Sequence, residues 1–100
     1  MSLDINKKRQ GSTLEIFLKG SLDTFTAPVL QAELDRSLDE VNKLVFDFSG
    51  LTFISSAGLR TMIEAYKAMS GKGQMKIVHV SDVLREVFDV TGLTGKLNIE

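Results

Sequence analysis

The stretch that decides the fold reads Val45-Phe46-Asp47-Phe48-Ser49-Gly50-Leu51-Thr52-Phe53-Ile54-Ser55-Ser56-Ala57-Gly58-Leu59-Arg60. It begins inside a mostly apolar run, residues 43–48, which is typical of a strand covered on both faces. After it, apolar residues recur at helical spacing from Leu59 to Met69. We therefore expect a buried strand, a loop over residues 49–55 and then a helix, with two serines where the loop meets the helix.

Similar patterns extend in both directions from this stretch. Residues 13–19 alternate like a strand, and residues 3–8 form a weaker strand that could pair with them through a turn near Gly11. A helix is predicted over residues 28–41, with Thr26 as its N-cap. The remaining predicted elements are a strand over residues 75–80, a helix that follows its N-cap Ser81 and stops near Gly92, and a short strand over residues 97–99.

The predicted order of elements is β-β-α-β-α-β-α-β, which favours an α/β fold. Because a helix follows each central strand, the central strands are expected to lie parallel in a mixed sheet with the helices packed against it. A chain of 100 residues fits one domain, which we expect to span residues 1–100.

The composition is that of an ordinary soluble globular protein, with 43% hydrophobic and 25% charged residues. The formal net charge is -1, and no basic face of the kind that binds nucleic acid is visible. The chain contains no cysteine, which excludes disulfides and thiol chemistry. No N-terminal apolar segment is typical of a signal peptide and no run is long enough to span a membrane, so we expect a cytoplasmic location.

The junction between the loop and the second helix is where the sequence places chemistry. In an open α/β sheet, ligands usually bind at the carboxyl ends of parallel strands, and a helix N-terminus favours an anion there. A phosphoryl group on Ser56 would therefore be tolerated without unfolding the domain. Gly58 has no side chain, so we expect that a partner could approach closely at this position. Either Ser55 or Ser56 could instead simply cap the helix, because serine is a leading N-cap residue.

Other residues indicate no second reactive site. His79 is the only histidine and is expected to be structural, because no other histidine or cysteine supports a metal site. A serine hydrolase is disfavoured, since residues 54–58 lack the first glycine of a Gly-x-Ser-x-Gly elbow. Phe25 and Phe53 flank two loops that should meet at one end of the sheet. Either could belong to the core, or could anchor a partner if it is exposed.

Three separated segments resemble the STAS family, named for sulphate transporters and anti-sigma factor antagonists. Residues 47–59 closely follow its pattern Asp-hydrophobic-Ser-x-hydrophobic-x-hydrophobic-hydrophobic-Asp-Ser-small-Gly-Leu. The segment Gly20-Ser21-Leu22-Asp23-Thr24-Phe25-Thr26-Ala27-Pro28 resembles the family's loop between the second strand and the first helix. The segment Phe88-Asp89-Val90-Thr91-Gly92-Leu93 resembles the end of its third helix. The resemblance covers essentially the whole chain and implies a single STAS-like domain.

The resemblance implies an anti-sigma factor antagonist, also called an anti-anti-sigma factor. Such a protein binds an anti-sigma factor that is also a serine kinase, which releases the sigma factor for transcription. The kinase phosphorylates the antagonist on the serine that matches Ser56, which ends binding, and a metal-dependent serine phosphatase reverses the modification. From the residues we expect no enzymatic activity, no cofactor or bound metal, and no direct contact with nucleic acid or membrane.

Matched residue by residue, the family implies a partner-binding surface around Ser56. Asp23 corresponds to an acidic residue near the phosphoacceptor. The chain departs from the pattern at Ser55, where many members have Asp, so Ser55 is a reserve phosphoacceptor. It departs again at Ala57, where many relatives have a hydroxyl. Arg60 lies four residues after Ser56 and could pair with a phosphoserine or be a solvated surface residue. The predicted partner-binding residues are Asp23, Thr24, Phe25, Phe53, Ser55, Ala57, Gly58 and Arg60.

An alternative function is that of a constitutive scaffold or a secretion-regulating STAS module. Phosphorylation would matter little in such a protein. The two hypotheses differ in whether a negative charge at position 56 changes affinity for the partner.

Overall fold

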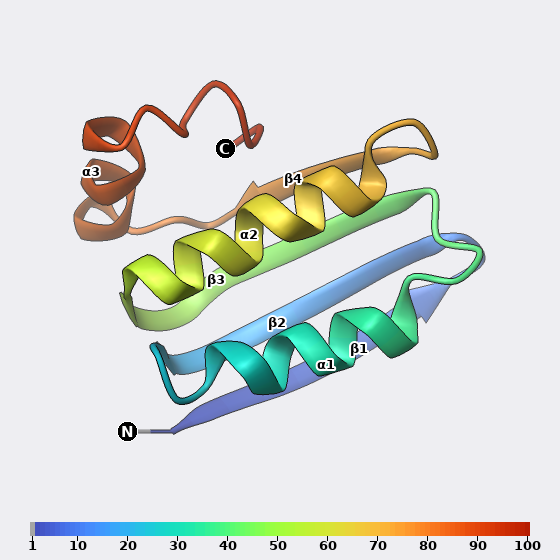
Figure 1. The fold of residues 1–100 in the computed structure, drawn as a ribbon, viewed down its shortest axis with the longest axis horizontal. Helices are drawn as coiled ribbons and strands as arrows, with labels where there is room; N and C mark the ends of the chain where they lie inside the picture. The colour runs from blue at the N-terminus through green and yellow to red at the C-terminus, as the bar shows by residue number, and fades with distance from the viewer. Residues whose placement is uncertain (1) are drawn as a thin grey trace.

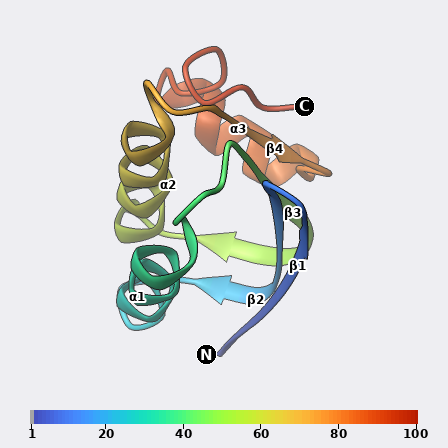
Figure 2. The same cartoon turned by 90° about the vertical axis from the view of Figure 1, so that its right-hand side faces the viewer.

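The computed structural model describes residues 2–100, in which a four-stranded sheet is combined with three helices (Figure 1). In chain order the elements are β1 (Leu3–Gln10), β2 (Thr13–Leu22), α1 (Ala27–Ser37), β3 (Lys43–Ile54), α2 (Ser56–Met69), β4 (Gln74–Val78) and α3 (Asp82–Val90). Figure 2 shows α1 and α2 side by side on one face of the sheet, with α3 beside β4. The expected α/β architecture is confirmed.

The sheet is mixed, as predicted, and its strands follow the order β1-β2-β3-β4. β1 and β2 form an antiparallel hairpin whose turn includes Gly11 at φ 59, a backbone angle that glycine adopts without strain. β2, β3 and β4 run parallel to one another, with α1 and α2 as the crossover connections. The carboxyl ends of β2 and β3 therefore lie at the same edge of the sheet, where α1 and α2 begin.

The core lies between the sheet and its helices. The alternating side chains Leu14, Ile16 and Leu18 of β2 are buried, and so are Leu44, Phe46 and Phe48 of β3. The predicted apolar stripes of the helices meet them, with Leu30 and Leu34 of α1 and Met62 and Met69 of α2 fully buried. α3 contributes Phe88, whose ring centroid lies 6.2 Å from that of Phe48.

The expectation of a loop over residues 49–55 is wrong, because β3 continues to Ile54. Ser49 and Gly50 indicate the end of a strand in the sequence, yet β2 also extends to Leu22 and pairs with most of this segment. Gly50 pairs with Lys19, and Ile54 pairs with Leu22. Two irregularities in the register between β2 and β3 let the ladder continue past the small residues.

β4 ends at Val78 and not at residue 80, and two larger differences concern α1 and the segment after α3. α1 ends at Ser37 and not near Val41, since the chain turns through Glu40 at φ 60, outside the helical region. The strand expected over residues 97–99 is reduced to one bridge between Ile77 and Ile99, because Asn98 has a left-handed φ of 56. Leu97 is nevertheless completely buried, so this segment contributes to the core without forming a strand.

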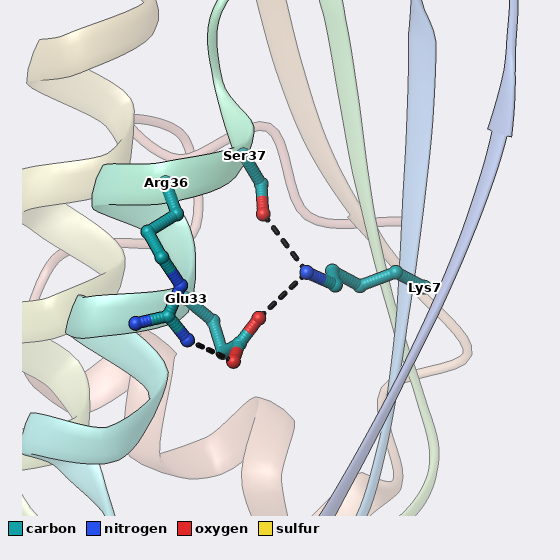
Figure 3. A network of polar contacts seen from close by, with 4 residues as sticks. All are labelled: Lys7, Glu33, Arg36 and Ser37. Carbon is teal, nitrogen blue, oxygen red and sulfur yellow. Dashed lines mark hydrogen bonds and ion pairs between the residues drawn. The ribbon is translucent and has the colours of Figure 1, made fainter.

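A polar network fastens β1 to α1 on the helix-covered face of the sheet (Figure 3). The Nζ of Lys7 donates to Oε2 of Glu33 at 2.6 Å and to Oγ of Ser37 at 3.0 Å. Arg36 pairs with the other carboxylate oxygen of Glu33. The hydrogen bond from Lys7, with help from Arg36, holds the pKa of Glu33 below its ordinary value despite partial desolvation. These contacts show that α1 lies over β1.

Candidate functional site

The two serines at the junction of β3 and α2 have different roles in the structure. Ser55 is the N-cap of α2, and its Oγ accepts a hydrogen bond from the N–H of Gly58 at 3.3 Å. Its own N–H donates to the carbonyl of Leu22 at 2.9 Å, which joins the ends of β2 and β3. Ser56 is the first helical residue and is exposed, and its hydroxyl has no hydrogen-bond partner among residues 2–100. Capping and exposure are thus divided between the two hydroxyls.

Asp23 organises the loop between β2 and α1. Its Oδ1 accepts hydrogen bonds from the backbone N–H groups of Phe25 at 2.9 Å and Thr26 at 3.0 Å. The hydrogen bond from the Thr26 backbone, reinforced by that from Phe25, lowers the pKa of Asp23 although partial burial opposes this. Asp23 is only 8% exposed. The charge of Asp23 is therefore used to fold the loop, and its contribution to a partner-binding surface stays a prediction.

Thr26 occupies the N-cap position of α1, as predicted, but its hydroxyl does not cap the helix. The Oγ1 donates to the carbonyl of Ser21 at 2.8 Å and accepts from the N–H of Asp23 at 2.8 Å. The hydroxyl bonds back into the loop because the second helical residue, Pro28, has no N–H to donate, and the N–H of Val29 donates to the carbonyl of Thr26. Hydrogen bonds consequently hold both ends of the loop between β2 and α1, which gives its outer residues a fixed position.

Two aromatic side chains stand out from this edge of the sheet. Phe25 is 84% exposed and Phe53 is 44% exposed, so neither belongs to the core. Between them lies a hollow of about 260 Å³ lined by Asp23, Thr24, Phe25, Phe53 and Ser55. We call these five residues together with Ser56 the serine surface. Exposed aromatic side chains beside a hollow are typical anchors for a protein partner.

A second hollow of about 240 Å³ lies between α1 and α2 and shares Thr24 with the first. Ala57, Arg60 and Glu64 line its α2 side. Arg60 is exposed and forms no ion pair or hydrogen bond within residues 2–100. Three of the predicted residues therefore meet here. Glu64 was not predicted, because only the packing of α1 against α2 places it at this hollow.

Gly58 is buried, which corrects the expectation that a partner approaches it. A Cβ at this position would lie 2.8 Å from Cγ of Leu22, 2.8 Å from Cγ1 of Ile54 and 2.9 Å from the carbonyl oxygen of Leu22. The missing side chain lets the first turn of α2 pack closely against the ends of β2 and β3. Gly58 thus positions Ser56 from within the domain.

Asp47 and His79 form a separate polar pair. The Nδ1 of His79 lies 2.9 Å from Oδ2 of Asp47, and the N–H of Ser49 donates to Oδ1 at 2.9 Å. Burial alone would raise the pKa of Asp47, but the hydrogen bonds from Ser49 and His79 outweigh it and lower the pKa. His79 is bonded in the way expected of a structural histidine. Among residues 2–100, no cluster of three or more His, Cys, Asp or Glu side chains could hold a metal ion.

The chain is similar to several known proteins. An anti-sigma-B factor antagonist from Bacillus subtilis is 24% identical, over 99% of this chain and 92% of its own. The structure of an anti-sigma factor antagonist from Mycobacterium paratuberculosis matches with a TM-score of 0.89 at 22% identity, covering 98% of this chain and 85% of that one. The phosphorylated form of the Bacillus cell fate determinant SpoIIAA matches with a TM-score of 0.76 at 20% identity, covering 99% and 89%. At these identities the two structures show a shared fold.

No helix of residues 2–100 has the length and apolar character needed to cross a membrane. The model of the STAS domain family matches residues 4–100, which is nearly the whole sequence. The chain therefore belongs to the STAS domain family.

Proposed function

We propose that this chain is an anti-sigma factor antagonist. It binds a cognate anti-sigma factor, itself a serine kinase, through the serine surface, and phosphorylation of Ser56 ends the complex. Membership of the STAS family supports the proposal, as does similarity to curated relatives that are named anti-sigma factor antagonists. The protein acts by binding in the cytoplasm and not as an enzyme, and a metal-dependent serine phosphatase restores its active form.

The single observation that best supports the proposal is the state of the Ser56 hydroxyl. It is exposed, it has no hydrogen-bond partner among residues 2–100, and it lies at the start of a helix next to Ser55, which lines the hollow flanked by Phe25 and Phe53. A kinase can reach such an oxygen without unfolding the domain. Ser55 is the weaker acceptor, because its Oγ already accepts the hydrogen bond of the Gly58 N–H and its side chain is only partly exposed.

The switch follows from the charge of the phosphoryl group. Phosphorylation adds about -1.5 to -2 charge units at neutral pH. An interface that buries a new, unpaired charge loses about 3 kcal/mol or more. Since about 1.4 kcal/mol corresponds to a tenfold change in affinity, a loss of at least a hundredfold is expected. No change of fold is required.

A catalytic role for Ser56 has no support in the geometry. The only histidine of the chain is bonded to Asp47, and Ser56 has no hydrogen bond to any base among residues 2–100. Labelling by a serine-reactive probe tests this directly. We expect no stoichiometric modification of Ser56.

The experiment begins by recovering the anti-sigma factor kinase from the host's soluble proteins with this chain as bait. The purified kinase and ATP should then phosphorylate the wild type at Ser56, as mapped by mass spectrometry, and leave Ser56→Ala unmodified. Ser56→Asp should bind the kinase at least tenfold more weakly than the wild type does. Ser81→Asp is the matched control, since Ser81 is an exposed N-cap serine on α3 and aspartate caps equally well.

Two outcomes would contradict the proposal. Continued phosphorylation of Ser56→Ala would move the acceptor elsewhere. Equal affinity of the wild type and Ser56→Asp would instead support a scaffold or secretion-regulating module that works without the switch.

A further inference from the structure

β1 forms an open edge of the sheet. It is an eight-residue strand that pairs with β2 on one side, and no strand within residues 2–100 pairs with its other side. The opposite edge is less open, because Ile77 of β4 is bridged by Ile99. An uncovered edge presents unpaired backbone N–H and C=O groups that can accept another strand.

The hairpin fixes which residues of β1 offer these groups. The carbonyl of Ser2 accepts a hydrogen bond from the N–H of Ser21 at 2.9 Å, so position 2 is directed toward β2. Backbone direction alternates along a strand, and the register of β1 with β2 has no bulge. The even positions are therefore bonded to β2, and the outward-facing groups belong to Leu3, Ile5, Lys7 and Arg9.

These directions restrict how a second β1 could pair in antiparallel fashion. Odd positions must face odd positions, because only these have free backbone groups on the outer side. A register centred on Asn6 meets this requirement, with Leu3 opposite Arg9 and Ile5 opposite Lys7. It also places Asp4 opposite Lys8 and Asn6 opposite itself.

The charges of the sheet select the same register. Within one chain, Asp4 is paired with Lys19 and Lys8 with Glu15. A second copy in this register extends each pair into a row of alternating sign, from Lys19 through Asp4 to Lys8 and Glu15 of the other copy. Opposite charges on facing cross-strand residues are favourable. Lysines commonly protect an edge strand from pairing, but here each faces a residue that is not cationic.

The neighbouring registers lack this complementarity. Centring the pair on Lys7 places two lysines directly opposite each other, which is unfavourable. Centring it on Ile5 places Asp4 opposite Asn6 and Lys8 opposite Ser2, so neither charge faces an opposite one. The register around Asn6 is the one that satisfies both the backbone and the charges.

α1 supplies an independent observation on the helix-covered face. Glu33 reaches Lys7, so the stripe of α1 that contains Glu33 lies above β1 (Figure 3). Val29 precedes Glu33 by one turn on this stripe and is 57% exposed. In the register around Asn6 the helices of both copies lie on the same face of the joined sheet. The two α1 helices then run side by side, where Val29 can be covered.

We propose that two copies of this chain associate through β1, antiparallel and centred on Asn6, into one continuous sheet. The pairing uses no residue of the serine surface and is independent of the proposed function. Its first consequence is that the wild type sediments as a dimer at micromolar to millimolar concentration. A monomer throughout this range would overturn the proposal.

A cysteine cross-link tests the register, since the chain has no cysteine of its own. In Asn6→Cys the two new thiols face each other with Cα atoms about 4.5 Å apart, within disulfide range, so mild copper-catalysed air oxidation should give mainly the cross-linked dimer. In the control Lys8→Cys the two thiols are offset by four residues, roughly 13 Å, and should not cross-link efficiently. Equal cross-linking of both variants, or none in Asn6→Cys, would refute the register.

A mixing experiment tests the charges without relying on the stability of one variant. Lys8→Glu alone would place Glu opposite Asp4, and Asp4→Lys alone would place Lys opposite Lys8, so each should dimerise at least tenfold more weakly. Mixed together, every facing pair has opposite charges again and the heterodimer should form. Each substitution also affects the pairing of β1 with β2 inside its own chain, but this effect is the same whether the variant is alone or in the mixture. It therefore does not explain a difference between the two measurements. Unimpaired dimerisation of either variant alone, or no heterodimer in the mixture, would contradict the proposal.

Discussion

At the scale of single residues, the adjacent serines Ser55 and Ser56 have different roles in the structure. Ser55 bonds the N–H of Gly58 and so stabilises the start of α2, whereas the hydroxyl of Ser56 is exposed and unbonded among residues 2–100. The sequence leaves open which of the two caps the helix. That question is decided by where β3 ends, because the N-cap must be the last residue with an extended backbone.

Because only Ser55 caps the helix and only Ser56 is exposed, we expect one alanine variant to change stability and the other to change phosphorylation. Ser55→Ala loses an N-cap and should lower the free energy of unfolding by about 1 kcal/mol, while it still accepts phosphate at Ser56. Ser56→Ala should leave the free energy of unfolding within about 0.5 kcal/mol of the wild type and abolish phosphorylation. Urea denaturation and a kinase assay measure the two properties on the same samples. If both properties changed in the same variant, the assigned roles would be wrong.

Gly58 provides a second prediction at this scale. Gly58→Ala places a Cβ against Leu22 and Ile54, closer than side chains normally approach, so the free energy of unfolding should fall by about 1–3 kcal/mol. Gly95→Ala is the control, because a Cβ there meets nothing within 4 Å and the site is exposed. Urea midpoints compare the two. A neutral effect of Gly58→Ala would show that the first turn of α2 is not packed as described.

At the scale of elements, the loop between β2 and α1 depends on the ionised form of Asp23. Its pKa is lower in the folded protein than the ordinary value of 3.8, so its contribution to stability is complete above that value and is lost as the pH falls toward the folded pKa. Asp23→Asn cannot titrate. The free energy of unfolding of this variant should therefore fall less steeply between about pH 5 and pH 3 than that of the wild type. Parallel curves for the two proteins would argue against an ionised Asp23 in the loop.

Phe25, on the same loop, should affect binding but not folding. Because it is 84% exposed, Phe25→Ala should change the free energy of unfolding by no more than about 0.5 kcal/mol. As an aromatic anchor it should nevertheless contribute at least tenfold to affinity for the proposed kinase. Val83→Ala, at a position 70% exposed on α3, is the control and should bind normally. Titration calorimetry separates the variants, and equal affinities would remove Phe25 from the interface.

Elements were predictable where a local signal determines them. Ser81 caps α3 through the N–H of Leu84, as its position before the apolar periodicity indicates. The signals failed where a distant partner decides. The extension of β3 beyond Phe48 requires β2 alongside it, and no local pattern contains that condition. The loop-folding role of Asp23 is different, because its carboxylate bonds backbone N–H groups only two and three residues along the chain, a turn that Asp favours and that was not predicted from the sequence.

At the scale of the whole molecule, the fold brings two distant segments to one edge. Because β2 and β3 are parallel neighbours, their carboxyl ends coincide, and the bond from Ser55 to the carbonyl of Leu22 fixes them together. Alternating strands and helices allow this arrangement to be predicted from the sequence. The exposure of Phe25 could not be predicted, because it depends on how the intervening loop is closed by Asp23 and Thr26.

The same arrangement predicts that phosphorylation of Ser56 leaves the domain intact. The net charge changes from -1 to about -2.5 to -3, but the new charge is placed on an exposed oxygen at a helix N-terminus, where a negative charge is favourable by about 0.3–1 kcal/mol. The phosphorylated protein should therefore unfold with the same free energy as the unmodified protein or one slightly higher. Its amide chemical shifts should change only around the serine surface and the first turn of α2. Kinase-treated Ser56→Ala serves as the control. A loss of more than about 1 kcal/mol, or shift changes that reach α3, would mean that the switch acts by rearranging the fold and not by placing a charge in the interface.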